Sequence, residues 1–581
     1  MTLPGVEVLH SVWLTARDGT RLVSDVYRPD RPGEYPVLVY RSLGPRATIA
    51  QAAPCRAARA ADRGYVVVVQ EARGCGDSEG EYRPLRHEGE DGFDTVEWAA
   101  TLPGSSGDVA MFGQSYSATV QYQAAAACPP HLRTIVPVYG MPTAYRNHYF
   151  NNGALELNNL MAYTAYYARQ ALRRDGLPDD SLDDLLAERL PEWPLRPLRD
   201  DVLRTLPLQR LVDRFKLCAP FLEEDLRCGA DPRYWQDADA RLAWSQIRVP
   251  VLHVGSWYDS YLYDTIAMYE GISRHATTPS ARQNQCLLIA PFAHTASFGG
   301  PNLGNAGELD FGPQAHLDAW EVSMAWFDHV LKAGRPARER FPAARVFVTG
   351  ENQWRDEECW PVDDAVRTAV YLSGETAANG SSGAGRLSWH APTTAEPPDS
   401  YLYDPLDPVP TLGGRLLARA AGPMDRRPVE SRDDVLVYTS DALDHPIEAV
   451  GQVTVVVYAS SSAPDTDFVA SLVDVYPDES AQLIADGIVR ARHQAVTGDS
   501  RPLEPGRPRE FCIDLWSIGH VFAAGHRIRL EVTSSSFPRW NRNLNTGLPL
   551  LSEEVPVEAA QTVYHDPDRP SRMMLPLRVR S

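Results

Sequence analysis

The stretch Val109-Ala-Met-Phe-Gly-Gln-Ser-Tyr-Ser117 decides the fold. Its first four residues form a short apolar run, which is typical of a strand buried on both faces of a parallel sheet. Its last residues begin an alanine-rich segment with helical spacing that continues to Cys128. Between them, Gly113 and Ser117 flank Ser115 in a G-x-S-x-S pattern, with serine where a second glycine is usual. A serine in a tight strand-to-helix turn indicates a nucleophile, and the alternative is a serine that caps the helix.

Strand and helix patterns alternate over the first 140 residues and again from about residue 248. This alternation is typical of a parallel sheet whose strands are joined by crossover helices. From about 145 to 240 the chain is rich in Leu, Arg and Asp, with helical spacing and no convincing strand, which indicates a helical insertion. Further apolar runs that we assign to the sheet are Tyr35–Tyr40, Tyr65–Gln70, Thr134–Val138, Pro250–Val254 and Cys286–Ile289.

Beyond about residue 343 the helical patterns nearly vanish, and short alternating runs recur between Pro, Gly and Ser residues. Such a rhythm predicts an all-β sandwich or jelly roll. We therefore predict an α/β protein with three domains: a discontinuous core at 1–144 and 241–342, an inserted helical cap at 145–240, and a β domain at 343–581. The runs assigned to the β domain are Arg345–Val348, Val435–Tyr438, Val453–Tyr458, Phe468–Asp474 and Ile528–Val532.

Composition excludes several classes of protein. The 581 residues carry 56 basic and 76 acidic side chains, a net charge of −20, which argues against a nucleic-acid or anionic-membrane partner. No apolar run approaches the roughly 18 residues needed to span a bilayer, and the first residues lack the pattern of a signal peptide. The eight cysteines are scattered without a C-x-x-C pair, as expected of reduced thiols in a cytoplasmic protein. Histidine and glycine spacings indicate neither a metal nor a cofactor.

Two later strand ends supply partners for a serine nucleophile, which needs a base and a carboxylate that orients the base. The strand 250–254 leads into Gly255-Ser-Trp-Tyr-Asp259, and the strand 286–289 leads into Ala290-Pro-Phe-Ala-His294. Functional groups of open α/β sheets lie at such carboxyl ends, and the order Ser, Asp, His suits a strand-turn-helix nucleophile. A helix cap for Asp259 and a loop histidine for His294 are the non-catalytic alternatives. Order and position together favour a triad of Ser115, His294 and Asp259.

Motifs along almost the whole chain resemble one family. They are Asp18–Leu22, Asp25–Pro29, Glu71–Gly74, Ser78–Gly80, Met111–Tyr116, Gly255–Asp259, Pro291–His294, Gly350–Arg355, Tyr403–Pro410 and Gly525–Val532. The sequence is similar to the cocaine esterase / X-Pro dipeptidyl-peptidase group of serine hydrolases, which includes α-amino acid ester hydrolases. The resemblance implies an α/β-hydrolase core, an inserted helical cap and a C-terminal jelly-roll domain. It also implies acyl transfer to Ser115 and hydrolysis of a small-molecule ester or amide, with the Tyr116 N–H as one oxyanion donor.

The sequence departs from that family in the loop after the first long core strand. There the family carries a tyrosine whose hydroxyl is a second oxyanion donor, in an R-x-x-Y pattern. This chain has Arg41-Ser42-Leu43-Gly44, so the phenol is absent. The Ser42 hydroxyl, the Gly44 N–H or the Tyr40 phenol could replace it, although strand alternation predicts that Tyr40 is buried. Two other interpretations of the missing phenol are that the substrate is activated and needs less stabilisation, or that the protein is a weak or repurposed hydrolase.

The inserted helices are expected to shape the substrate pocket. Tyr163, Tyr166 and Tyr167 crowd one predicted helix, and Tyr163 and Tyr167 share a face of it. With Phe221 and Trp257 they are candidate pocket residues, and packing of the cap on the core is the alternative. The sequence leaves two other functions open: a biosynthetic acyltransferase with the same triad, or a non-catalytic binding protein on a hydrolase scaffold. It also leaves a homodimer open.

Overall fold

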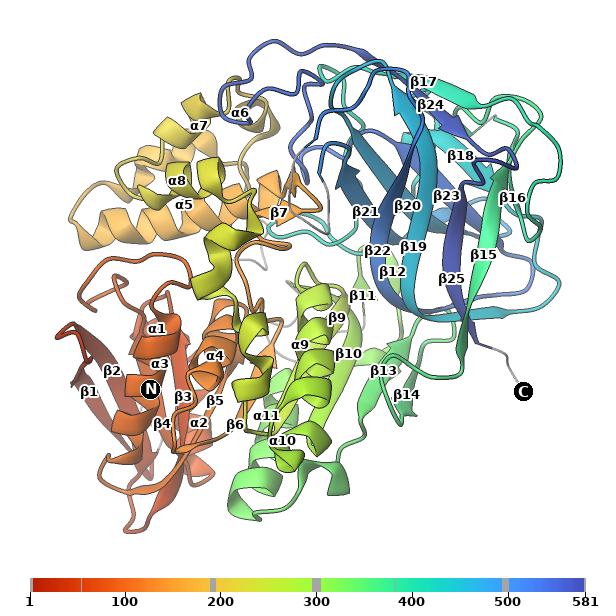
Figure 1. The fold of residues 1–581 in the computed structure, drawn as a ribbon. Helices are drawn as coiled ribbons and strands as arrows, with labels where there is room; N and C mark the ends of the chain where they lie inside the picture. The colour runs from red at the N-terminus through yellow and green to blue at the C-terminus, as the bar shows by residue number, and fades with distance from the viewer. Residues whose placement is uncertain are drawn as a thin grey trace.

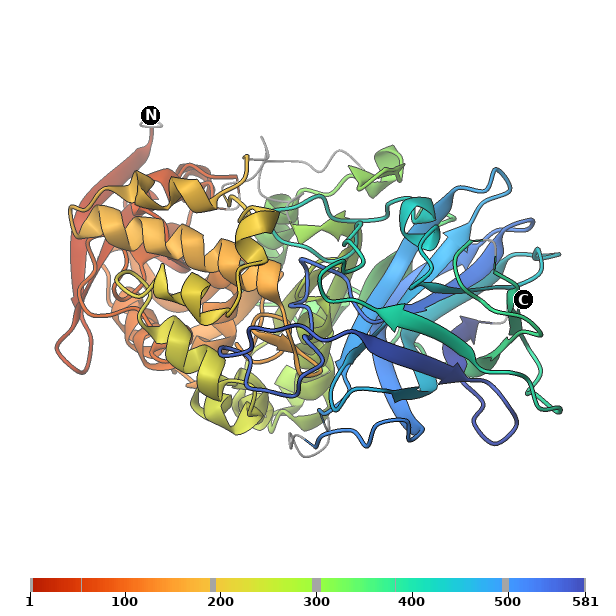
Figure 2. The same cartoon turned by 90° about the horizontal axis from the view of Figure 1, so that it is seen from above.

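The computed structural model describes residues 4–53, 55–188, 195–294, 305–381, 383–493 and 501–578. These residues form two large sheets (Figure 1), and a group of helices lies beside the second sheet and above the first. Seen from above, the same helices cover the red and orange core strands (Figure 2). Among the described residues, no helix combines the length and the apolar character needed to cross a membrane.

The first sheet has the strand order β1-β2-β4-β3-β5-β6-β9-β10-β13-β14 in the described residues. From β4 to β13 neighbouring strands are parallel, so their carboxyl ends meet at one edge. The predicted apolar runs form these strands because every residue of a central strand is covered by helices on both faces. The strands are β1 (Val6–Thr15), β2 (Arg21–Pro29), β3 (Tyr35–Ser42), β4 (Val66–Glu71), β5 (Ser105–Gln114), β6 (Leu132–Val138), β9 (Val251–Tyr258), β10 (Gln285–Ala293), β13 (Ala344–Val348) and β14 (Gln353–Glu357).

Alternate residues of the strands enter two separate cores. On one face, β3 and β5 contribute Val39 and Met111, which pack with helices α3 and α4. On the other face, Leu38 and Phe112 pack with α2 and α11. Helices α3 and α4 touch closely, since a Cβ on Gly92 would lie 2.5 Å from the Cβ of Ala124. The crossover helices are α2 (Ala57–Asp62), α3 (Glu88–Ala100), α4 (Tyr116–Ala126), α9 (Leu262–His275) and α11 (Ala319–Phe327).

Between β6 and β9 the chain leaves the sheet and forms the inserted helices. The longest is α5, which carries the three neighbouring tyrosines of the sequence prediction. The insertion also holds a two-residue hairpin, β7 with β8, which corrects the expectation that it contains no strand. Strands of only two residues are too short to show an alternation of apolar and polar residues in the sequence. The elements are β7 (Phe150–Asn151), β8 (Ala154–Leu155), α5 (Leu157–Arg174), α6 (Asp200–Leu203), α7 (Gln209–Asp213) and α8 (Phe221–Cys228).

The second sheet contains eleven of the described strands, mostly antiparallel, which agrees with a C-terminal β domain. Its jelly-roll arrangement stays a prediction. The strands are β15 (Ala365–Ser373), β16 (Gly385–Ser388), β17 (Asp399–Tyr403), β18 (Leu436–Thr439), β19 (Ile447–Ser461), β20 (Asp467–Val475), β21 (Ala481–Arg490), β22 (Arg509–Phe522), β23 (Arg527–Thr533), β24 (Ala559–Tyr564) and β25 (Arg572–Arg578).

One predicted strand belongs to the other sheet. The run Arg345–Val348, assigned to a β domain that starts at 343, lies in β13 and pairs in parallel with β10 of the core. Strand β14 then adds antiparallel to β13. The core sheet thus continues beyond the predicted boundary of 342/343. An alternating pattern shows that a segment is a strand, but it does not show which sheet the strand joins.

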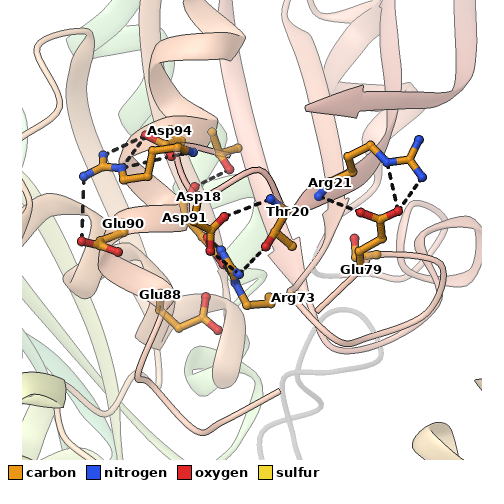
Figure 3. Close-up of polar contacts among 12 residues, drawn as sticks. Asp18, Thr20, Arg21, Arg73, Glu79, Glu88, Glu90, Asp91 and Asp94 are labelled. Atoms are coloured by element: carbon orange, nitrogen blue, oxygen red, sulfur yellow. Dashed lines mark hydrogen bonds and ion pairs between the residues drawn. The ribbon is translucent and has the colours of Figure 1, made fainter. Parts of the chain in front are cut away.

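A salt-bridge network joins two of the family motifs, Asp18–Leu22 and Glu71–Gly74, to helix α3. Arg73 donates to Asp91 on α3 at 2.6 Å, and to Asp18 and Thr20 in the turn between β1 and β2, both at 2.7 Å (Figure 3). The residue after Arg73 must be glycine, because a Cβ there would lie 2.2 Å from a backbone nitrogen and the backbone φ is +68°. The network joins the first hairpin to the helix that packs on α4.

Buried charges join the β domain to the core and the insertion. Asp486 on β21 accepts from Arg539 at 2.5 Å and lies 3.4 Å from Arg415. Arg539 is also 3.7 Å from Glu156, the residue before α5. Arg415 donates to the carbonyl of Trp257 on β9 at 3.1 Å. The β-domain arginines thereby fix the end of one core strand and the start of the longest inserted helix.

Replacing the shared carboxylate, in Asp486→Asn, is expected to destabilise the protein by about 3–5 kcal/mol, because Arg415 loses its buried carboxylate partner and Arg539 keeps only Glu156, at 3.7 Å. Asp356→Asn breaks an exposed pair with Arg345 and should cost less than about 1 kcal/mol. Urea unfolding of both variants beside the parent measures the difference. Equal stability of the two variants would show that the network contributes little.

The same carboxylate predicts a pH dependence. Burial alone would raise the pKa of Asp486, but the charges of Arg539 and Arg415 outweigh it and hold the pKa below its usual range. A carboxylate with a lowered folded pKa stabilises the protein above its ordinary pKa of about 4 and loses that contribution as the pH falls. Unfolding measured between neutral pH and pH 3 should therefore show a smaller acid-dependent loss in Asp486→Asn than in the parent.

Candidate active site

Ser115 lies in a strained turn between β5 and α4. Its backbone has φ 59° and ψ −123°, a conformation that a residue with a Cβ seldom adopts. The N–H of Ser115 donates to the carbonyl of Val138 at the end of β6, at 2.9 Å. Gly113 has φ +139°, and a Cβ there would lie 2.6 Å from the Cβ of Ser117 and 3.0 Å from the ring of Tyr40. With serine at 117, the turn closes only if residue 113 is glycine.

The three residues of the predicted triad meet at the carboxyl edge of the core sheet. The Nε2 atom of His294, directly after β10, lies 3.0 Å from the Oγ of Ser115. Its Nδ1 atom lies 2.5 Å from the Oδ1 of Asp259, directly after β9. Asp259 and His294 are 0% and 1% exposed, whereas Ser115 is half-buried. With Nδ1–H donated to the carboxylate, the lone pair of Nε2 faces the serine hydroxyl, which is the geometry for removing its proton.

Two tyrosines that the sequence analysis missed surround the imidazole. The ring of Tyr261 stands edge-on to His294 with centroids 5.3 Å apart, and the ring of Tyr139 lies at 5.6 Å. The hydroxyl of Tyr139 bonds to Ser256 at 2.8 Å, and that of Tyr261 lies 3.1 Å from Nδ1 of His148. Tyr139 follows β6 at the same carboxyl edge, so the strand-end rule used for Asp259 would also have found it.

A buried ion network lies behind the first turn of α4. The hydroxyl of Tyr116 donates to Glu88 on α3, and Arg41 donates to the same carboxylate at 2.7 Å. Arg41 also lies 3.7 Å from Asp91, which holds Arg73. Burial raises the pKa of the Tyr116 phenol well above its usual range, so this hydroxyl keeps its proton and its bond. The side chain of Tyr116 is therefore anchored inside the core, while its backbone N–H belongs to the helix start beside Ser115.

The end of β3 and the loop after it hold the three groups that could replace the missing phenol. The N–H of Gly44 donates to the hydroxyl oxygen of Ser42 at 3.0 Å. Tyr40 is buried, as strand alternation predicts, and lies on the α2 and α11 side of the sheet. Its hydroxyl bonds to the side chain of Ser117 and the backbone of Gln114, and burial raises its pKa. The Gly44 N–H and the Tyr40 hydroxyl are therefore already engaged inside the protein.

The predicted pocket tyrosines divide into two groups. The ring of Tyr167 lies 4.4 Å from that of Tyr82 and 5.7 Å from that of Phe221. Tyr163 places its hydroxyl 2.5 Å from the hydroxyl of Tyr82 and its ring 4.8 Å from His148. Tyr167 and Phe221 thus pack in the core, the alternative that the sequence left open. Tyr166 differs from them, because its hydroxyl reaches the loop after β3.

Trp257 faces the β domain. Its indole N–H donates to the carbonyl of Phe347 on β13 at 2.6 Å, and its ring lies 6.1 Å from Trp360. A Cβ on Gly519 of β22 would lie 2.7 Å from the indole ring. Alternation would place residues 257 and 259 on the same face of a strand, but β9 ends at Tyr258, so Asp259 lies beyond the strand and does not follow this rule. We therefore assign Trp257 to the contact between core and β domain instead of the pocket wall.

Comparison with known proteins decides the family. A model described as X-Pro dipeptidyl-peptidase (S15 family) matches residues 18–296, and one described as X-Pro dipeptidyl-peptidase C-terminal non-catalytic domain matches residues 337–574. Cocaine esterase from Rhodococcus sp. (strain MB1 Bresler) is 33% identical over 98% of this chain and 98% of its own. This chain belongs to the cocaine esterase / X-Pro dipeptidyl-peptidase family. The resemblance found in its motifs is confirmed, and membership of this family supports hydrolase activity.

Two solved structures share the fold of this member of the cocaine esterase / X-Pro dipeptidyl-peptidase family. An aminopeptidase from the marine sediment archaeon Thaumarchaeota archaeon has a TM-score of 0.84 at 22% identity, covering 99% of this chain and 97% of that one. An α-amino acid ester hydrolase has a TM-score of 0.82 at 24% identity, with the same coverage. At these identities the likeness concerns the fold. It extends over the core, the insertion and the β domain together.

The close packing in the turn at Ser115 predicts that two glycine-to-alanine variants of β5 differ in stability. Gly113→Ala should destabilise the protein by about 3 kcal/mol, because overpacking against Ser117 adds to the strain of a positive φ. Gly107→Ala is the matched control on the same strand, with φ +86° and no atom closer than 3.9 Å, and should cost about 1–2 kcal/mol.

The contact with Ser117 is tested by adding Ser117→Gly to Gly113→Ala, which should recover part of the lost stability. Thermal and urea unfolding compare the three variants. No recovery in the double variant would show that the clash with Tyr40, and not with Ser117, sets the cost.

Proposed function

We propose that the protein hydrolyses esters through an acyl-enzyme on Ser115. The observation that carries the proposal is the relay in which His294 lies 3.0 Å from the serine hydroxyl and 2.5 Å from Asp259. The alignment over 98% of both chains with cocaine esterase supports an ester as the substrate class. The serine is the half-buried member of the relay, so it is the one that a substrate reaches.

In the first step the Oγ of Ser115 attacks the carbonyl carbon while its proton passes to Nε2 of His294. The tetrahedral intermediate collapses, and the imidazolium gives that proton to the departing alkoxide, so the alcohol leaves. A water molecule then loses a proton to His294 and attacks the acyl-enzyme. The proton returns to Oγ as the acid leaves. Asp259 accepts the Nδ1–H throughout, which fixes the tautomer and stabilises the imidazolium.

The negative charge of each intermediate forms on the former carbonyl oxygen, and the Tyr116 N–H is the first donor proposed for it. This N–H is one of the unpaired donors at the start of α4, where the helix dipole also favours a negative charge. The network of Glu88 and Arg41 holds Tyr116 and therefore the position of its N–H. Donors fixed before the reaction contribute most to such stabilisation.

The inserted helices act as the cap of this site in the proposal. Tyr261 and Tyr139 line the imidazole, and the aromatic rings of His148 and Tyr163 continue the wall toward α5. Aromatic walls with few polar groups favour an apolar or aromatic acyl group. In this proposal the β domain is a jelly roll, and it supports the cap through the contact of Arg539 with Glu156.

A fluorophosphonate probe tests the nucleophile. The folded parent should be labelled on Ser115, and Ser115→Ala should lose the label together with esterase activity, by at least roughly 10⁴-fold in kcat. Ser106→Ala on the exposed start of β5 is the matched control and should keep both. Labelling is located by peptide mass spectrometry. A Ser115→Ala variant that keeps its activity would reject the proposal.

Substrate class is tested by steady-state kinetics with an aryl ester and an X-Pro anilide. We expect a higher kcat/KM for the ester, because the leaving phenolate needs less help from a general acid than an amine does. An ester with a bulky aromatic acyl group should also be accepted. Preference for the X-Pro anilide would assign the chain to the peptidases of its family.

A further inference from the structure

An oxyanion in a strand-turn-helix hydrolase is held by two donors, one at the start of the nucleophile helix and one near the loop after the third strand. The proposed function supplies the first, from Tyr116. In the loop, the N–H of Gly44 is taken by Ser42, and the hydroxyl of Tyr40 bonds to Ser117 beneath the turn. Either group would have to give up that bond to act as the second donor. The other candidates are the remaining hydroxyl proton of Ser42 and a group from outside this loop.

A phenol from the insertion occupies the space above this loop. A Cβ built on Gly44 would lie 3.3 Å from the hydroxyl oxygen of Tyr166 and 3.3 Å from the Cδ1 atom of Ile49. These contacts are tighter than ordinary van der Waals contacts, so a side chain at residue 44 would require Tyr166 and Ile49 to shift by a few tenths of an ångström. Residue 44 has no side chain, and the hydroxyl of Tyr166 on α5 lies next to the space that a side chain there would occupy.

The position of the Tyr166 ring connects it to the triad. It packs against an apolar cluster that contains Met141 and Tyr261. Tyr261 in turn stands edge-on to the imidazole of His294. The cavity of about 570 Å³ that Tyr166 also borders is lined by α5 and residues of the segment 186–196, and none of the described residues that line it belongs to the relay. The link from Tyr166 to the base therefore runs through the loop after β3 and the aromatic ring of Tyr261.

The chemistry of the phenol suits a neutral donor. Burial raises the pKa of Tyr166 above its usual value, with a smaller opposing effect from a hydrogen bond with the Gln170 side chain. The hydroxyl therefore keeps its proton at neutral pH. Gln170 lies one turn further along α5 and shares that face of the helix. The role requires no proton transfer, only a hydrogen bond that strengthens as charge develops on the substrate oxygen.

We propose that Tyr166 supplies the second oxyanion hydrogen bond, from the inserted helix instead of the core loop. The proposal rests on the proposed acyl-enzyme at Ser115. Its consequence is that catalysis needs the insertion in its seated position, because one donor belongs to the core and the other to α5. The contact of Glu156 with the β-domain arginine, at the start of α5, then helps to place a group that touches the reacting atoms.

Removing the hydroxyl tests the proposal directly. Tyr166→Phe should lower kcat for an aryl ester on the order of 100–1,000-fold with little change in KM, since the lost bond forms mainly in the transition state. Tyr167→Phe, the next residue of α5, packs in the core and should stay close to the parent. The alternative donor is tested by Ser42→Ala. A Tyr166→Phe variant with parental kcat, or a large loss confined to Ser42→Ala, would overturn the proposal.

Moving the phenol back to the loop gives an independent test. Tyr166→Ala removes both the donor and the obstacle, and adding Gly44→Tyr should then restore at least part of the lost kcat. Gly44→Tyr alone should instead impair folding or activity, because the new ring meets Tyr166 and Ile49. Circular dichroism and unfolding curves show which variants are folded. A folded double variant no faster than Tyr166→Ala would contradict a shared donor position.

These experiments distinguish a failure of the proposed nucleophile from a failure of the proposed oxyanion donor. If fluorophosphonate fails to label Ser115 in the parent, the proposed function itself is wrong. If the parent is labelled and Tyr166→Phe turns over ester at the parental rate, only the role of Tyr166 is wrong. Slow but complete labelling of Ser115 in Tyr166→Phe supports both, because the nucleophile is intact and the oxyanion site is weakened.

Discussion

The site depends on the strained backbone of one residue. Ser115 keeps a positive φ because β5 ends at Gln114, α4 begins at Tyr116, and the carbonyl of Val138 holds the N–H between them. That conformation lifts the side chain out of the sheet edge toward His294. Its neighbours are constrained as well: a Cβ at residue 113 would meet Ser117 and Tyr40, and α4 packs closely on α3 where Ala124 meets Gly92. Local strain of this kind persists only where the surrounding fold enforces it.

Parts of the chain far apart in sequence converge on this turn. Asp259 and His294 come from strands that return to the sheet only after the insertion. Arg415 of the β domain holds the carbonyl of Trp257, two residues before Asp259, and Arg539 faces Glu156 at the start of α5. The β domain contributes no member of the proposed relay. Its buried arginines nevertheless fix both the strand that carries the carboxylate and the helix that carries Tyr166.

The sequence predicted the relay and the order of domains because both follow from strand ends and periodicity. Ser115, Asp259 and His294 each follow an apolar run, and the parallel sheet brings such ends together. The sheet to which a strand belongs was less predictable. The run at Arg345–Val348 would show the same alternation in either sheet, and only its pairing with β10 assigns it to the core sheet. Among the three tyrosines of α5, spacing favoured Tyr163 and Tyr167, which share a face. The residue that contacts the loop after β3 is instead Tyr166. Helix periodicity could not predict this, because it does not reveal which face of a helix meets a loop from another domain.

In the proposed site, the core and the insertion each supply one hydrogen bond to the same oxygen. A crystal structure of the protein inhibited by an aryl phosphonate tests it most directly, because the phosphonyl oxygen on Ser115 occupies the oxyanion position. We expect this oxygen at roughly 2.7–3.1 Å from both the Tyr116 nitrogen and the Tyr166 hydroxyl. A phosphonyl oxygen bonded to Ser42, or to water with Tyr166 turned away, would contradict it.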